Sequence, residues 1–420
     1  MSEQETSFRA PRGTYDLLPP ASLEWRHVMG LAMDVFALSG YDPVETPIFE
    51  HTEVFERGVG EATEVVGKQM YTFTDRGDRS LTLRPEGTAP VVRAVLEHNL
   101  HRGPLPLKLA YAGPMFRQER PQKGRYRQFW QVGIEAIGVD AAALDAEVIE
   151  LGQRFLRDCG VETTLLLNSI GHLDPDCRGG YLAELRRFLQ ARRDDLAEDD
   201  RDRVDRNPLR TFDSKERATV AVMKDAPLIT DHLCADCDAH FAAVRALLGD
   251  LEVPYVLEPR LVRGLDYYTR TAFEFVSGEL GSQNAVGGGG RYDGLAESLG
   301  GDALPGIGFA LGIDRIVIAR GTHEVPRRVH VYVVAVGDET AARAALKLAT
   351  QLRRAGIGAD LDLAGRSMKG QMKQASGSGA RWAAILGERE LASGKATLKD
   401  LTTSDQREVD VDQVAEVVRP

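Results

Sequence analysis

The chain has 420 residues and a formal net charge of -11 at pH 7, with 43% hydrophobic and 27% charged residues. This is ordinary globular composition on a length that usually forms two or three domains. The acidic balance argues against a protein that coats nucleic acid indiscriminately, although it allows a local basic patch.

No apolar run approaches the ~20 residues that span a bilayer, and the N-terminal MSEQETSFRAPRG lacks the cationic-then-apolar order of a signal peptide. Four cysteines do not make a disulfide framework, so a cytoplasmic enzyme without membrane contact is expected. Cys234 and Cys237 form a CxxC with His240 close by, but one pair supplies too few ligands for a structural zinc site. We therefore predict no metal held by protein side chains.

The N-terminal part begins with a proline-bounded loop at 11–20. Ser22 is expected to cap an amphipathic helix that ends near Leu38, with Gly40 just beyond it. Residues 41–49 contain Pro43 and Pro47, which favour an extended edge segment.

Alternating residues at 71–75 and 80–84 predict a hairpin, followed by PEGTAP and a helix over 91–98. Glu86 and Thr88 lie at this strand-to-helix junction. They could cap the helix, or Glu86 could pair with the ammonium group of a substrate.

A strongly basic segment joins two apolar, alternating stretches between Leu109 and Gly138, which predicts an antiparallel hairpin. Period-2 alternation would place Arg117, Glu119, Gln131 and Glu135 on one face. Such a face suits a site for a triphosphate and a zwitterion. The alternative is a solvated hairpin whose arginines pair with surface carboxylates.

Residues 142–158 read as a helix and 162–168 as a strand. From 171 to 253 the composition turns to Arg, Asp, Glu, Ala and Leu without strand-like alternation. We expect a helical insertion with helices at 181–196 and 240–248, and the charge run at 192–206 is interpreted as solvated helix faces.

Three further stretches favour a walled pocket on a sheet. LVRGLDYYTRTAFEF, residues 261–275, gathers Arg263, Asp266, Tyr267 and Tyr268 around one glycine. The glycine run at 287–290 lacks the context of a phosphate loop, so it indicates close approach of the backbone to a ligand instead. A glycine-rich strand then runs into a helix over 306–317, a stretch that contains Arg315.

From residue 329 strands and helices alternate, which predicts a compact α/β unit. The expected strands are 329–336, 359–363, 382–386, 395–401 and 407–411, and the expected helices are 340–354, 368–376 and 414–418.

These motifs together resemble the class II aminoacyl-tRNA synthetases. Phe-Arg-x-Glu at 116–119 with Arg125 to Phe129 is similar to motif 2, 306–317 to motif 3, and the helix and strand before 49 to motif 1. LRPEGTAPVVR and LVRGLDYYTRTAFEF resemble strings of the histidyl-tRNA synthetases. The alternatives are another class IIa synthetase and the histidine-binding regulatory subunit of ATP phosphoribosyltransferase.

The resemblance implies a role for each matching residue. Arg263 and Arg117 would be catalytic, and ATP would be bound by Arg117, Glu119, Phe129 and Arg315. Histidine would be bound by Glu86, Thr88, Gln131, Glu135, Tyr267 and Tyr268, and the tRNA acceptor end by Gln122, Lys123 and Arg125.

The resemblance also implies an α+β fold: an antiparallel class II catalytic domain with a helical insertion and a C-terminal α/β anticodon-binding domain. The expected division is catalytic domain 1–170, insertion 171–253, catalytic domain continued 254–321, linker 322–328 and anticodon-binding domain 329–420. ATP and Mg²⁺, L-histidine, tRNA(His) and a second copy in a homodimer are the implied substrates and partners.

Overall fold

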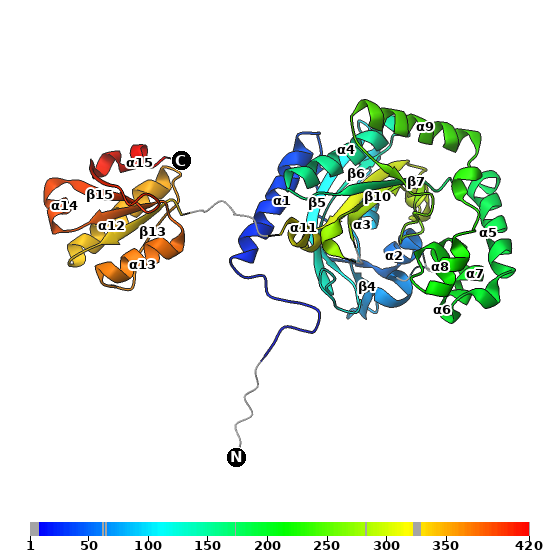
Figure 1. Ribbon diagram of the computed structural model, residues 1–420, viewed down its shortest axis with the longest axis horizontal. Coiled ribbons are helices and arrows are strands. Elements are labelled where there is room, and N and C mark those ends of the chain that lie inside the picture. The colour runs from blue at the N-terminus through cyan, green and yellow to red at the C-terminus, as the bar shows by residue number, and fades with distance from the viewer. Residues whose placement is uncertain are drawn as a thin grey trace, which may run out of the picture. The chain divides into compact units, whose positions relative to one another are not determined.

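The computed structural model describes residues 8–60, 63, 65–172, 174–281, 284–321 and 329–419. The chain separates into two compact units, Met1–His323 and Glu324–Pro420 (Figure 1). The expected linker at 322–328 lies outside the described residues. The finer division of the first unit at 170/171 and 253/254 stays a prediction.

An eight-stranded sheet forms the centre of the first unit. Neighbouring strands are antiparallel except at the edges, where β1 pairs with β5 and β8 with β7 in parallel. In spatial order the strands are β1 (Asp42–Pro43), β5 (Leu107–Phe116), β6 (Gln128–Ile137), β11 (Gly306–Gly312), β10 (Ala285–Arg291), β9 (Thr269–Val276), β7 (Thr164–Ser169) and β8 (Val256–Leu257). The α+β class with an antiparallel catalytic sheet is thereby confirmed.

One face of this sheet packs on helices. Even-numbered residues of β6, such as Val132 and Ile134, lie in a core with side chains of the covering helices, while Gln131 and Glu135 alternate to the opposite face. The covering helices are α1 (Ala21–Ala37), α4 (Ala142–Asp158), α9 (Ala235–Asp250) and α11 (Ile313–Arg320).

The start of α1 differs from the prediction that Ser22 caps it. Pro20 occupies the N-cap position, and no side chain caps the first turn. Proline lacks a backbone N–H, and it is tolerated where a helix begins because the first N–H groups have no intrahelical partner. The end of the helix at Ala37 lies within one residue of the expected boundary.

Helix α9 begins earlier than the predicted 240–248 and belongs to the layer over the sheet. Its Phe241, Val244 and Leu248 share the core of α4 and the central strands. The smaller helices that precede it lie together to the right of the sheet in Figure 1. They are α5 (Gly180–Gln190), α6 (Glu198–Arg201), α7 (Arg203–Arg206) and α8 (Arg217–Met223).

The predicted single helix at 181–196 is wrong in its second half. Helix α5 ends at Gln190 and a short 3-10 turn follows at Arg193–Asp195. Aspartates compete with the helical backbone for hydrogen bonds and so favour turns and caps. The run at 192–206 is also not wholly solvated, because Asp200 and Val204 are buried.

The second face of the sheet is partly covered by a small three-stranded sheet and short helices. The predicted hairpin at 71–84 is confirmed. The elements are β2 (Phe49–His51), β4 (Ser80–Leu83), β3 (Tyr71–Thr74), α2 (Thr52–Val59), α3 (Thr88–Glu97) and α10 (Leu295–Ser298).

The second unit is the expected α/β arrangement around a five-stranded sheet. Asp338 caps its long helix by accepting from the Thr340 amide at 2.9 Å. One helix, α14, escaped prediction because it is a six-residue segment between two glycines. In spatial order the strands are β13 (Ala359–Leu361), β12 (Val331–Ala335), β14 (Trp382–Leu386), β15 (Lys395–Asp400) and β16 (Gln406–Asp410), and the helices are α12 (Glu339–Arg354), α13 (Met368–Ser378), α14 (Glu388–Ser393) and α15 (Val414–Val417).

Among the described residues, every helix is too short or too polar to cross a lipid bilayer.

Candidate active site

A cavity opens on the second face of the large sheet, above β6, β9, β10 and β11. The structure brings most of the residues predicted for the site to its walls. They are Glu86, Thr88, Arg117, Glu119, Arg125, Phe129, Gln131, Arg263, Tyr267, Tyr268 and Arg315. Gln122, Lys123 and Glu135 do not line it.

Arg117 is held at the mouth of the basic hairpin. Strand β5 ends at Phe116, so Arg117 and Glu119 lie just beyond the regular strand. Both nevertheless line the same cavity as Gln131, the side on which the alternation placed them. Arg117 Nε donates to the Pro85 carbonyl oxygen at 2.9 Å, and its guanidinium lies 5.3 Å from the Phe129 ring centroid. Burial lowers the pKa of Arg117, but guanidinium groups ordinarily titrate above 12, so it remains a cation.

Arg263 reaches the same cavity from the loop before β9. Its Nη1 donates to Glu274 Oε1 at 2.7 Å, and the guanidinium lies 5.7 Å from the Tyr268 ring centroid. Its Nε finds no hydrogen-bond partner among the described residues. Burial opposes the charge, but the neighbouring Glu274 carboxylate outweighs it and raises the pKa of Arg263.

Arg315 comes from the first turn of α11. Its Nε donates to the Gly124 carbonyl oxygen at 3.2 Å, and its Nη1 donates to the Ala285 carbonyl oxygen. Arg315 therefore connects the tip of the basic hairpin with β10. Three arginines distant in the sequence thus border one cavity.

Glu86 caps helix α3, one of the two roles considered for it from the sequence. Its carboxylate accepts from the Thr88 amide at 2.7 Å and from the Ala89 amide at 3.0 Å, at the start of α3. Tyr267 OH lies 3.5 Å from the same carboxylate. Burial raises the pKa of Glu86. The cap does not exclude an ammonium partner, because Glu86 also lines the cavity.

Glu135 lies beneath the cavity with no exposed surface. Its Oε1 accepts from Thr88 Oγ1 at 2.7 Å and from Tyr111 OH at 3.4 Å. Oε2 makes no hydrogen bond of regular geometry among the described residues, although the Tyr292 hydroxyl interacts with the carboxyl group. Burial raises the pKa of Glu135 to about 8. A Cβ at Gly308 would lie 2.0 Å from Oε2, so only glycine leaves room for this carboxyl group.

The glycine run in β10 allows this strand to pack closely against its neighbour in the sheet. A Cβ on Gly289 would lie 1.9 Å from the Gly308 carbonyl oxygen, and one on Gly287 would lie 2.3 Å from that of Ala310. Within the chain, these glycines let β10 approach β11 closely, whereas the predicted approach to a ligand stays a prediction. Gly287 and Gly288 also line the cavity, so the same lack of side chains leaves its floor open.

The tip of the basic hairpin is a tight turn. The amides and carbonyls of Gln122 and Arg125 pair reciprocally at 3.1 and 2.9 Å, and Gly124 has a φ of 74°. Gln122 and Lys123 are exposed, while Arg125 turns inward and forms a 3.2 Å ion pair with Glu119.

Sequence reasoning missed several residues in the cavity wall. Glu274 holds Arg263, and Asp314 accepts from Tyr15 OH at 2.5 Å. Both had a usable signal: Glu274 alternates with apolar neighbours in β9, and Asp314 directly precedes Arg315. Tyr126 and Leu265 complete the missed group.

An antiparallel sheet that gathers arginines from a strand–loop–strand unit and a strand-to-helix unit around one cavity defines the catalytic domain of a class II aminoacyl-tRNA synthetase. Comparison with known proteins specifies the family. The family model described as "Histidyl-tRNA synthetase" matches residues 13–316, and the one described as "Anticodon binding domain" matches residues 330–420. The chain belongs to the histidyl-tRNA synthetase family.

Relatives from several bacteria are similar in sequence to this chain over nearly its full length. A histidine–tRNA ligase of Rhodococcus erythropolis is 52% identical over 99% of this chain and 98% of its own. One of Halothermothrix orenii is 49% identical over 96% of both chains. The crystal structure of apo histidyl-tRNA synthetase from S. aureus matches with a TM-score of 0.81 and 38% identity, covering 98% of this chain and all of the other.

Proposed function

We infer that this protein is a histidine–tRNA ligase. It activates L-histidine with ATP to histidyl-adenylate and pyrophosphate, then transfers the histidyl group to the 3′-OH of the terminal adenosine of tRNA(His). The observation that carries this assignment to particular residues is the convergence of Arg117, Arg263 and Arg315 on one cavity.

The first step is an in-line attack by the histidine carboxylate on the α-phosphate of ATP. Two anions must be brought together, and negative charge grows on the phosphate oxygens in the transition state. Arg117 and Arg263 bind the α-phosphate and are the catalytic residues, and Arg315 binds the γ-phosphate. Arginine suits these positions because it stays charged and offers a planar fork of donors to oxygen pairs.

The adenine ring stacks on Phe129, with Glu119 beside it in the ATP site. The ring of Phe129 already lies against the Arg117 guanidinium at 5.3 Å. Base and α-phosphate are therefore bound by neighbouring side chains, which fixes the reacting phosphorus relative to the purine.

Mg²⁺ fits this cavity. Glu119 and Glu274 line it and offer the hard carboxylate oxygens that magnesium prefers. Held there, the ion would neutralise negative charge on the bound nucleotide. The arginines hold the nucleotide from the remaining sides.

The amino acid lies deeper, over β6 and β9. Its ammonium group is bound by Glu86, Thr88 and Gln131, and its imidazole by Glu135 and Tyr268. Tyr267 also lies in the histidine site. Support comes from Glu135 Oε2 and Gln131 Oε1, buried acceptors that make no hydrogen bond of regular geometry among the described residues. An amino acid with an apolar side chain of the same size would leave the Glu135 carboxyl unpaired, a situation that can give ~10⁴-fold rejection.

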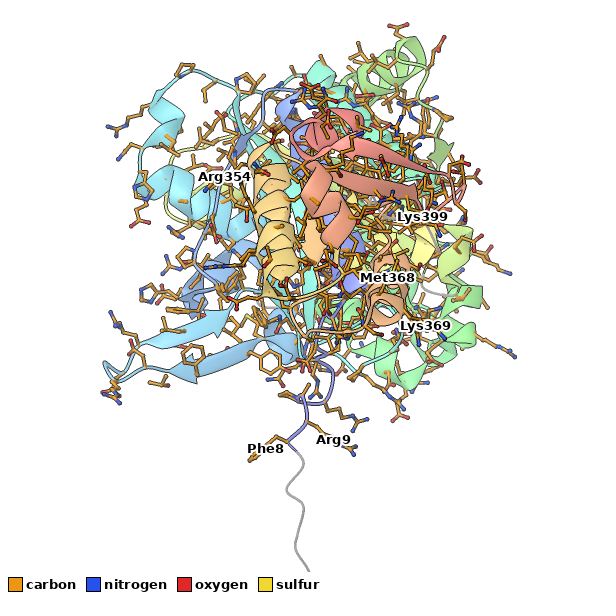
Figure 2. The ribbon with its side chains drawn as sticks, turned by 90° about the vertical axis from the view of Figure 1, so that its left-hand side faces the viewer. Phe8, Arg9, Arg354, Met368, Lys369 and Lys399 are labelled. Atoms are coloured by element: carbon orange, nitrogen blue, oxygen red, sulfur yellow. The ribbon has the colours of Figure 1, made fainter. Side chains whose placement is uncertain are left out.

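The acceptor end of the tRNA is bound by Gln122, Lys123 and Arg125. The exposure of Gln122 and Lys123 at the hairpin tip supports this role. The second unit binds the anticodon. Cationic side chains on its surface, such as Arg354 and Lys369 in Figure 2, offer contacts to phosphates.

The protein works as a cytoplasmic homodimer. All four cysteines are free, as in a reducing compartment. Phe49 and Phe73 on the small sheet are 51% and 44% exposed and stack edge to face at 6.3 Å. Exposed aromatic pairs are typical of interface cores. Light scattering at micromolar concentration tests the dimer.

The regulatory subunit of ATP phosphoribosyltransferase is not favoured. Ligases match over the whole chain, and a second family model covers residues 330–420. The deciding experiment is aminoacylation of total tRNA by the purified protein with each amino acid in turn. Charging with histidine alone is expected, whereas histidine binding without charging would support the regulatory alternative.

A further inference from the structure

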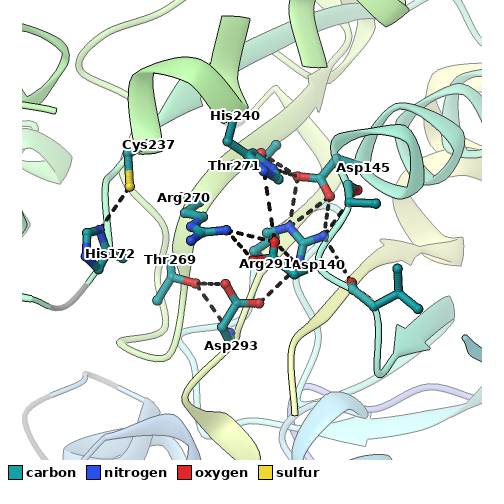
Figure 3. A network of polar contacts seen from close by, with 12 residues as sticks. Asp140, Asp145, His172, Cys237, His240, Thr269, Arg270, Thr271, Arg291 and Asp293 are labelled. Atoms are coloured by element: carbon teal, nitrogen blue, oxygen red, sulfur yellow. Dashed lines mark hydrogen bonds and ion pairs between the residues drawn. The ribbon is translucent and has the colours of Figure 1, made fainter. Parts of the chain in front are cut away.

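Three cysteines and one histidine meet at the two ends of the inserted helices. His172 and Cys177 follow β7, Cys177 within the short turn η3 (Pro175–Gly179), while Cys234 and Cys237 lie at the start of α9. One ligand atom from each lies within 4.8 Å of all the others. Figure 3 shows His172 and Cys237 facing each other.

The separations fit one tetrahedral ion. His172 Nδ1 is 3.0 Å from Cys237 Sγ and 3.6 Å from Cys234 Sγ. Zinc bonds of ~2.3 Å to sulfur and ~2.0 Å to nitrogen place neighbouring ligand atoms roughly 3.5–3.8 Å apart. Small side-chain adjustments therefore convert the cluster into a Cys₃His site.

The histidine is also oriented as a metal ligand. Its Nε2 lies 3.2 Å from Asp174 Oδ2, which leaves Nδ1 directed at the sulfurs. A carboxylate behind the second ring nitrogen is the usual support for a zinc-bound imidazole. The Cys237 amide lies 3.5 Å from Cys234 Sγ, a contact that stabilises a thiolate.

We propose that His172, Cys177, Cys234 and Cys237 bind one structural zinc ion. Zinc accounts for all four groups, whereas a disulfide would engage two thiols and leave the third thiol and the oriented imidazole without a role. A complete set of four protein ligands leaves no open coordination position, so the ion has a structural function.

The ion closes the base of the inserted segment. Helices α5 to α8 lie between Cys177 and Cys234 in the sequence, so binding joins the point where the chain leaves the sheet to the point where it returns. His240, one turn after Cys237 on α9, bonds to the buried Asp145 at 2.9 Å (Figure 3). The site therefore connects the insertion to the packed core.

The same turn supports the wall of the active site. Arg178, next to Cys177, is buried and donates to the carbonyl oxygens of Ile170 at 2.9 Å and Tyr268 at 2.6 Å. The Arg270 amide donates to the Gly171 carbonyl oxygen at 2.7 Å. The metal thus anchors the backbone that carries Tyr268 in the cavity wall.

Sequence reasoning predicted no metal because it found one CxxC pair. The other two ligands lie some sixty residues upstream, and only the return of α9 beside the end of β7 brings them together. The prediction of too few ligands was therefore wrong for the folded chain.

Elemental analysis of the full-length protein, expressed in medium with added zinc and purified without chelator, tests the proposal. One zinc per chain is expected. Cys177→Ser, Cys234→Ser and Cys237→Ser should each lose most of it, while Cys159→Ser, a buried cysteine outside the cluster, should retain it. Wild-type protein without zinc, or retention of zinc by all three cluster variants, would overturn the proposal.

A second measurement does not depend on how the variants fold. Wild-type protein reconstituted with Co²⁺ should show the visible absorption of tetrahedral cobalt with a thiolate charge-transfer band. Titration of thiols in denaturant without reductant should find four per chain. Two thiols per chain would mean a disulfide and overturn the metal site.

Proteolysis supplies a readout beyond metal content. Removal of zinc by a chelator should expose the segment 178–233 to cleavage at least tenfold faster, and re-addition of zinc should restore protection. Unchanged cleavage would contradict the anchoring role. None of these measurements involves aminoacylation, so their outcome is independent of the proposed function.

Discussion

Two buried arginines in the first unit differ in their surroundings: the partners of one belong wholly to the protein, whereas the other has donors directed at a cavity. Arg291 is fully buried, and its nitrogens bond to Asp145, Asp293 and the carbonyl oxygens of Val139 and Ala141 (Figure 3). Arg263 has one carboxylate, Glu274, and a buried Nε without a partner among the described residues. The first arginine is saturated by the protein, whereas the second borders a cavity.

The difference has a physical reason. Burying a charge costs several kcal/mol unless partners replace water, so Arg291 requires its full set of acceptors. Arg263 tolerates incomplete pairing because the cavity admits water or a polyanion. Arg263 is therefore free to direct donors at a ligand in the cavity, as the proposed function requires.

The largest expected effect concerns Arg291, the arginine whose partners belong wholly to the protein. Asp145→Leu leaves Arg291 buried without its main partner, so the free energy of unfolding should fall by about 3–5 kcal/mol. Urea unfolding followed by circular dichroism measures it. Asp145→Leu with Arg291→Met removes both charges and should recover much of the loss, and a double variant no more stable than the single one would refute the charge-pair explanation.

The next largest effect concerns Arg263, the arginine proposed to be catalytic. Arg263→Ala should reduce ATP–pyrophosphate exchange by ~10²–10³-fold, as for loss of one donor to a transition-state oxyanion, with nearly unchanged unfolding. Arg260→Ala is the matched control, because Arg260 is exposed and outside the cavity. Exchange near the wild-type rate in Arg263→Ala would remove its catalytic role.

A smaller effect concerns the amino-acid pocket. Glu135→Ala should raise the KM for histidine roughly tenfold, because loss of a buried hydrogen-bond partner costs about 1–3 kcal/mol, and change that for ATP far less. Steady-state aminoacylation gives both constants. Glu97→Ala, an exposed carboxylate of α3, is the control, and equal rises in both KM values would move Glu135 out of the side-chain pocket.

The last prediction is a pH dependence of stability. The pKa of Glu135, about 8, lies above its ordinary value of 4.5, so the folded chain holds this proton more tightly than the unfolded one. The resulting stability is complete below pH 4.5 and is lost as pH rises toward 8, at about 1.4 kcal/mol per pH unit. Glu135→Gln should flatten the wild-type decrease in unfolding free energy between pH 5.5 and 8, and parallel profiles would contradict the shift.

Much of the fold follows from local pattern. Helix α4 and the strands of the second unit obey their hydrophobic periods, and the face assigned to Gln131 and Glu135 is confirmed by the packing of β6. Gly40 marked the C-terminal end of α1 to within one residue, although its start was assigned to Ser22 and not to Pro20. These features depend on neighbours in sequence, which a single chain displays.

The remainder depends on contacts across the fold. Arg117 lies past the end of β5, where strand alternation no longer determines direction. The saturation of Arg291 by Asp145, and the meeting of His172 with Cys237, each join residues distant in sequence. Residue type identified these groups as candidates, but only the arrangement of the strands determines their partners.

Gly308 shows how one missing methyl group shapes the site. A side chain there would press on the Glu135 carboxyl and the Ile134 carbonyl oxygen. Alanine would therefore force that acid toward the substrate and make the pocket shallower. In the proposed histidine site, the depth available to the imidazole would then depend on an atom absent from β11, so a survey of functional variants should find position 308 intolerant of every replacement.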